Sequence, residues 1–167
     1  MWRVLAILGG VSGAVALSQF PEFSQQYLQR LAGKVDALTA LAVQFDATAS
    51  ANDLTREAAL LAMTGSAVLD DQQADMRATL ALQGVLADNL AALRAAGPLE
   101  RLTMPQRLGD LDTLRATWAD FRPALPATAE GAISAGLGYV GGWALVSALG
   151  ALLAALLAAL FGRRRAR

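Results

Sequence analysis

The sequence predicts an all-α protein in which two transmembrane helices flank an antiparallel helical domain, a hairpin or bundle. Residues 131–162 contain no charged side chain, and residues 4–21 form a second uncharged stretch. Between them, apolar residues recur at intervals of three and four, the spacing of an amphipathic helix. The chain is 55% hydrophobic and 17% charged, against about 25% charged in average soluble proteins. We therefore expect lipid to cover part of it.

The longer uncharged stretch predicts a membrane span within residues 129–162. A hydrocarbon core of about 30 Å needs about 20 helical residues, and residues 131–162 provide 32 without a charge. The alternative is a helix buried in a soluble core. A domain of this size cannot surround an apolar helix of about 48 Å, the length of such a stretch at 1.5 Å per residue.

The first uncharged stretch predicts another span over residues 3–20, which is only moderately hydrophobic because it contains Gly and Ser. A secretory signal peptide is the competing interpretation, with Arg3 in its basic region and cleavage after Ala16, in the sequence Ala14-Val15-Ala16. We favour a retained helix, a possible signal anchor, because the apolar character continues through Leu17 and Phe20. Cleavage at Ala16 stays an alternative.

The charges predict how the chain crosses the membrane. All fourteen acidic residues lie between Glu22 and Glu130, where nine basic residues leave a net charge of −5. The remaining charge is basic and lies at the two ends, at Arg3, Arg163, Arg164, Arg165 and Arg167. Basic residues beside spans stay on the cytoplasmic side. We therefore expect a multi-pass protein of a bacterial inner membrane, with both termini cytoplasmic and a periplasmic domain over residues 21–128.

The basic tail, residues 163–167, fits this topology better than a nucleic-acid role. Five residues beside a membrane orient a span or contact anionic lipid more often than they bind nucleic acid. Membrane lipid is the first expected partner, and nucleic acid is not expected.

Three helices are expected in the middle domain. The first follows Pro21, a residue suited to a first helical turn, and continues to the small and polar segment 46–55. After a short helix near 55–63, a second long helix is expected to open at Asp70 or Asp71 and to end at Gly97-Pro98. The third is expected over 106–121. The two long helices are similar in length, and we expect them to pack antiparallel.

The order of these segments resembles an uncharacterised proteobacterial membrane family, domain of unknown function 2937. The resemblance covers nearly the whole chain, from "SQFPEFSQQYLQRLAGKVDAL" through "DMRATL" to "TWADFRPALPATAEGAISAGLGYVGGW". It implies the architecture and an inner-membrane setting. No activity comes with it, because no function is assigned to the family.

Catalytic signatures are missing from the sequence. There is no Cys and no His, which removes the commonest ligands of zinc and the side chain that titrates near neutral pH. Asp70-Asp71 and the pair Asp110 and Asp112 are too close along a helix to face each other. No phosphate-binding, nucleophile-elbow or calcium-loop motif occurs. We expect no enzyme activity, no cofactor and no metal site.

Small residues in the spans are candidates for helix packing. Gly9 and Gly13, like Gly138 and Gly142, have the spacing that lets two helix backbones approach closely. Further small residues follow as a stripe, among them Ala148, Ala151 and Ala155. The packing can join the two spans of one chain or different subunits. An alternative is that Gly and Ala are simply common in such spans.

Aromatic side chains are candidates for anchoring at the membrane surface, where their rings lie at headgroup depth. Trp118, Phe121, Tyr139 and Trp143 are expected at the outer interface, and Trp2 at the inner one. Near the start of the first long helix, Gln25, Gln26 and Gln29 form a polar group. This group is either a partner site or, as we favour, an ordinary solvated face.

Together these features predict a non-enzymatic inner-membrane scaffold or accessory subunit. It would act through helix–helix association with itself, as a homo-oligomer, or with another membrane protein of the cell envelope. One alternative is a periplasmic ligand-sensing module that signals through a separate partner. A channel-forming oligomer lined by the Gly/Ala face is the weakest of the three hypotheses.

Overall fold

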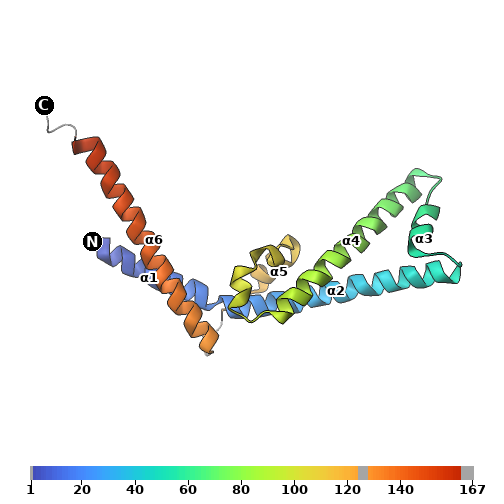
Figure 1. Cartoon of the computed structure of the whole chain (residues 1–167), viewed down its shortest axis with the longest axis horizontal. Coiled ribbons are helices and arrows are strands. Elements are labelled where there is room, and N and C mark those ends of the chain that lie inside the picture. Colours follow the sequence, from blue (N-terminus) through green and yellow to red (C-terminus); the bar gives the residue numbers. More distant parts are fainter. Residues whose placement is uncertain (1, 124–127, 163–167) are drawn as a thin grey trace. The chain divides into compact units, whose positions relative to one another are not determined.

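The computed structural model describes residues 2–123 and 128–162, and their regular structure is entirely helical. This confirms the all-α prediction. Eight helical elements follow one another along these residues (Figure 1): α1 (Trp2–Ser18), α2 (Phe20–Ala51), α3 (Arg56–Ala62), α4 (Ala67–Ala95), the 3₁₀ turns η1 (Glu100–Thr103) and η2 (Pro105–Leu108), α5 (Leu111–Asp120) and α6 (Ala129–Gly162).

Two stretches within the described residues are long and apolar enough to cross a membrane. One begins with α1 in the helical region Trp2–Ala51, and the other is Ala129–Ala159 in α6. The chain divides into two compact units. We call the unit that contains α1 and α6 the helix pair, and the unit of residues 25–121 the central unit.

The helix pair is formed by α1 crossing α6 in opposite directions (Figure 1). Early in α1, Trp2 lies against Gly150, whereas Gly13 lies against Gly138. The contacts with α1 therefore stop near Gly150, and residues 151–159 of α6 are all exposed. Seventeen residues in α1 and 34 in α6 correspond to about 26 Å and about 51 Å of helix.

A short break separates α1 from α2 at Gln19, two residues before Pro21. Proline has no N–H to donate to the carbonyl four residues earlier, which here belongs to Leu17, and its ring crowds that turn. The sequence predicts a kink at Pro21, and the interruption falls just before it. Helix α2 resumes at once, because the Phe23 N–H donates to the Gln19 carbonyl at 2.9 Å.

One apolar core holds the central unit together. It joins four residues of α2 to three of α4: Tyr27, Leu28, Leu31 and Val35 with Leu86, Leu90 and Leu93. Met104, Leu108 and Leu114 pack against it from η1–η2 and α5. The spacing of these residues along each helix is the expected stripe of three and four. Farther along, Gln83 of α4 donates a hydrogen bond to Thr39 of α2 at 3.1 Å.

Helix α3 connects α2 and α4 at the far end of the central unit (Figure 1). Thr55 caps it by accepting from the Ala58 N–H, and Ser66 caps α4 by accepting from the Leu69 N–H. The expected start of α4 at Asp70 or Asp71 is therefore wrong by a turn. The first interruption is also shorter than predicted, since α2 continues to Ala51.

The segment after Gly97-Pro98 differs from the single helix expected over 106–121. It forms the two 3₁₀ turns, and α5 begins only at Leu111. Pro105 begins η2, where its missing N–H costs nothing, and Gly109 follows its last residue. This bend allows Met104, Leu108 and Leu114 to reach the same core from one short stretch of chain.

Candidate functional site

The predicted packing glycines lie against each other within one chain. A Cβ atom at Gly13 would overlap the carbonyl of Gly138, and one at Gly142 would overlap the carbonyl of Gly9. Only residues without a side chain allow two helix backbones to approach this closely. The structure thus brings Gly9 and Gly13 of α1 together with Gly138 and Gly142 of α6.

Two more glycines belong to this contact although the small-xxx-small spacing did not single them out. A Cβ at Gly10 would lie 2.9 Å from the Tyr139 ring, and one at Gly150 would overlap the Trp2 indole. Each glycine makes room for an aromatic ring of the opposite helix. No sequence spacing links either glycine to its ring, because the two residues of each pair lie far apart along the chain.

The predicted alanine stripe lies elsewhere on α6. At 100° per residue, Ala148, Ala151 and Ala155 fall on the side turned away from α1. All three are exposed, so the structure does not bring them together with the glycine contact. Helix α6 therefore has two small-residue faces, one covered by α1 and one without a neighbour in the described residues.

The candidate anchoring residues lie in both units. In the helix pair, Trp2, Tyr139 and Trp143 are partly exposed, and Trp2 and Tyr139 also touch glycines of the opposite helix. In the central unit, the rings of Trp118 and Phe121 stack with centroids 6.5 Å apart. Trp118 remains 73% exposed, the largest fraction among the big apolar side chains that the structure describes. A predicted anchoring role for these rings stays a prediction.

The topology-determining arginines are only partly described. Arg3 is exposed in the first turn of α1. Arg163, Arg164, Arg165 and Arg167 lie outside the described residues.

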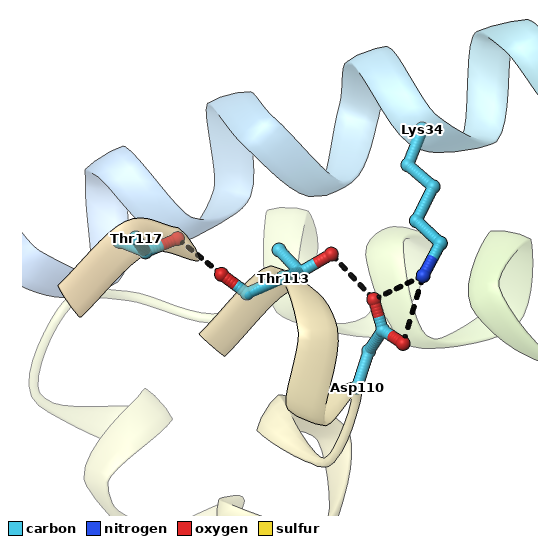
Figure 2. A network of polar contacts seen from close by, with 4 residues as sticks. All are labelled: Lys34, Asp110, Thr113 and Thr117. Carbon is cyan, nitrogen blue, oxygen red and sulfur yellow. Dashed lines mark hydrogen bonds and ion pairs between the residues drawn. The ribbon is translucent and has the colours of Figure 1, made fainter. Parts of the chain in front are cut away.

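A polar network of the central unit joins α5 to α2 (Figure 2). The Lys34 ammonium donates to both carboxylate oxygens of Asp110, at 3.0 and 2.8 Å. The Thr113 hydroxyl donates to the same carboxylate, and the Thr117 hydroxyl donates to the Thr113 carbonyl at 2.7 Å. Asp110 is the residue before α5 begins, so its charge also lies at the positive end of that helix.

The electrostatics of this network favour an ionised carboxylate. Burial opposes ionisation of Asp110, but the hydrogen bonds from Lys34 and Thr113 outweigh it and lower its pKa. Beside it, the phenol of Tyr27 is fully buried, and this burial raises its pKa. Since the network's groups serve as partners for one another, they hold α5 on α2, and we assign them a structural role.

Exposed ion pairs attach α3 to both long helices. The Arg56 guanidinium donates two hydrogen bonds to Asp46 of α2, at 2.7 and 2.5 Å. Arg77 of α4 donates two to Glu57 of α3, at 2.9 and 2.5 Å. These hydrogen bonds lower the pKa of both carboxylates. Sequence spacing could not reveal them, because each depends on how the chain turns at α3.

Within residues 2–123 and 128–162, no three His, Cys, Asp or Glu side chains lie close enough to hold a metal ion. Asp110 and Asp112, two positions apart in sequence, have different surroundings, since Asp112 is exposed. Asp70 is exposed in the first turn of α4, and Asp71 is exposed after it. Among these carboxylates, Asp110 pairs its charge with Lys34, and the other three lie at the surface.

Comparison with known proteins gives one match. Residues 1–163 match the family described as "Protein of unknown function (DUF2937)". No curated protein and no solved structure matches the chain.

Proposed function

We propose that this chain, which belongs to the DUF2937 family, is a non-enzymatic scaffold or accessory subunit of the bacterial inner membrane. It would act through association of its α6 helix with a second copy or with another envelope protein. One observation carries the proposal. The glycine faces of α1 and α6 are already occupied within the chain, whereas the alanine face of α6 is exposed along a helix longer than a bilayer requires.

The proposal includes a topology with both termini in the cytoplasm and the central unit in the periplasm. The net negative charge of residues 22–130 and the basic ends support it. In the helix pair, the antiparallel contact of α1 with α6 is compatible with termini on one side of a membrane.

A reporter fused near residue 80, in α4, tests the topology. Alkaline phosphatase at this position should be active, because the enzyme folds only outside the cytoplasm, and a fused green fluorescent protein exported in the same way should be dark. Fusions after residue 167 should give the opposite pair of results. A fluorescent, phosphatase-negative fusion near residue 80 would contradict the proposed topology.

Association through the alanine face is tested by two substitutions that each add three carbon atoms to α6. Ala151→Leu adds them on the alanine face, whereas Leu157→Phe adds them on another exposed side of the same helix. The complex isolated in mild detergent is measured by native mass spectrometry. We expect Ala151→Leu to shift it toward the single chain and Leu157→Phe to leave it unchanged. A wild-type chain that is monomeric and without companions would refute the proposal.

A further inference from the structure

A groove in the central unit gathers polar side chains that the proposed function does not use. Its volume is about 500 Å³, within the usual range for small-ligand sites. Helix α2 provides one wall, and α4 and η1 provide one arginine each. The lining residues are Gln25, Leu28, Gln29, Ala32, Gly33, Asp36, Arg94 and Arg101.

The wall from α2 is a single helical stripe. Gln25, Gln29, Gly33 and Asp36 follow at steps of four, four and three, so they lie on one face of the helix. This face is open at Gly33, where an added Cβ would meet no atom within 4 Å. The glutamines that the sequence groups near the start of this helix are thus divided, with Gln25 and Gln29 lining the groove.

The two arginines on the other side are held differently. Arg101 is 7% exposed, and its Nε donates to the Leu93 carbonyl at 2.9 Å near the end of α4. This bond fixes the guanidinium in place. Arg94 is exposed, and no ion pair joins it to another described residue. One arginine is therefore preorganised and the other is available to close on a ligand.

From this arrangement we propose that the groove binds a small ligand through a phosphoryl group. Phosphoryl oxygens accept hydrogen bonds from guanidinium groups in favourable geometry. A guanidinium has several N–H donors, so Arg101 can keep its bond to Leu93 while it donates to the same phosphoryl group as Arg94. The amides of Gln25 and Gln29 supply neutral donors and acceptors along the rest of the ligand. Asp36 adds a negative charge to the same groove, which favours a ligand with a single anionic group. Either a free phosphate ester or a phospholipid headgroup provides this chemistry.

The test uses the full chain in mild detergent and phosphate-free buffer. Inorganic phosphate and glycerol phosphate are titrated calorimetrically as free probes, and phosphatidylglycerol retention is counted by native mass spectrometry as the lipid arm. Arg94→Gln removes one guanidinium from the groove. Arg115→Gln is the matched control, because Arg115 is an exposed arginine of α5 outside it.

We expect Arg94→Gln to weaken binding of the effective probe by about tenfold or more, the usual size of a lost charge-assisted hydrogen bond. Arg115→Gln should change it less than about twofold, as expected for a surface charge. Binding of a free probe alone identifies a soluble ester, and retention of lipid alone identifies a headgroup. Both results support the site. Absence of binding in both arms, or equal weakening by the two variants, would overturn it.

Discussion

The helix pair and the central unit are both built from antiparallel helices, but they pack by opposite means. In the helix pair, glycines at the contact let backbone meet backbone, as at Gly13 and Gly138. In the central unit, large side chains fill the space between helices, as Leu31 and Leu93 do at 0% exposure. The difference follows from the surroundings expected for each unit. In lipid there is no hydrophobic driving force for helix association, so close van der Waals contact must hold the helices together. In water, burial of apolar surface is favourable, so leucine side chains pack in the core.

The largest effect is expected from breaking the glycine contact. Gly138→Leu would place a side chain on the Gly13 backbone, which cannot move aside, so α1 and α6 must separate. A Cβ at Gly136, two residues away, would meet no atom within 4 Å, so Gly136→Leu should leave the pair intact.

The chain has no cysteine, so cross-linking can measure this separation. A Cβ at Gly9 would lie 3.2 Å from that of Val146, slightly closer than the usual disulfide range of about 3.5–4.5 Å, so the two helices must move apart by a few tenths of an ångström to accept this bond. We expect Gly9→Cys with Val146→Cys to cross-link in the Gly136→Leu background and not in the Gly138→Leu background. Equal cross-linking in both backgrounds would contradict backbone contact as the basis of the pair.

A smaller but still large effect is expected from emptying the leucine core. Leu93→Ala should lower the free energy of unfolding of the central unit by about 2–5 kcal/mol, since it removes a fully buried side chain and leaves a cavity. Leu82→Ala on the same helix is the comparison, because Leu82 is 41% exposed. Urea unfolding followed by circular dichroism measures both. Similar losses for the two variants would mean that the core does not lie where the structure places it.

An intermediate effect is expected at the polar network beside this core. Asp110→Asn removes the ion pair with Lys34 and should cost about 1–3 kcal/mol, as for a partly buried hydrogen-bonded charge. Asp112→Asn, at an exposed residue two positions away, should change little.

The same carboxylate predicts a pH dependence. Its pKa is lower in the folded chain than the ordinary value of 3.8, so its stabilising contribution is complete above that pH. The contribution is lost as the pH falls from there through the lowered pKa. Unfolding measured from pH 6 downward should show a drop in stability that is smaller in Asp110→Asn. A wild-type and a variant with parallel pH profiles would contradict this role for Asp110.

The smallest effect is expected at the exposed ion pairs around α3. Glu57→Gln breaks the pair with Arg77, but both side chains are well exposed, and solvent screens their interaction. We expect the unfolding midpoint to be the same within error, and high salt should remove any residual difference between the variant and the wild type. A clear destabilisation would show that α3 depends on charge rather than on the buried Leu60.

Periodicity and length were sufficient to predict the helical class and two candidate spans, because both follow from local composition. Boundaries were less predictable. Ser66, rather than the following aspartates, begins α4, since capping by a serine hydroxyl satisfies a helix N–H directly. The turn η2 replaced the start of the helix predicted over 106–121, because the chain bends at Gly109 and so brings Leu108 and Leu114 to the common core.

The site was predictable only where its members repeat along one helix. The glycine spacings in α1 and α6 are visible in the sequence. The sequence does not show that the two motifs face each other. The Lys34–Asp110 pair joins residues far apart in the chain, as does the groove between α2 and the arginines. Such contacts arise from how helices pack, and spacing within a helix carries no signal of them.

The unequal lengths of α1 and α6 have a consequence for the surrounding bilayer. Trp2 lies against Gly150, so twelve residues of α6, about 18 Å of helix, extend past the start of α1. A membrane thick enough to cover all of that extension would leave Arg3 in hydrocarbon. The guanidinium can stay hydrated if α6 tilts, if lipid beside α1 is compressed or if water follows the arginine inward. In a membrane, the helix pair would therefore either tilt or thin the leaflet beside α1.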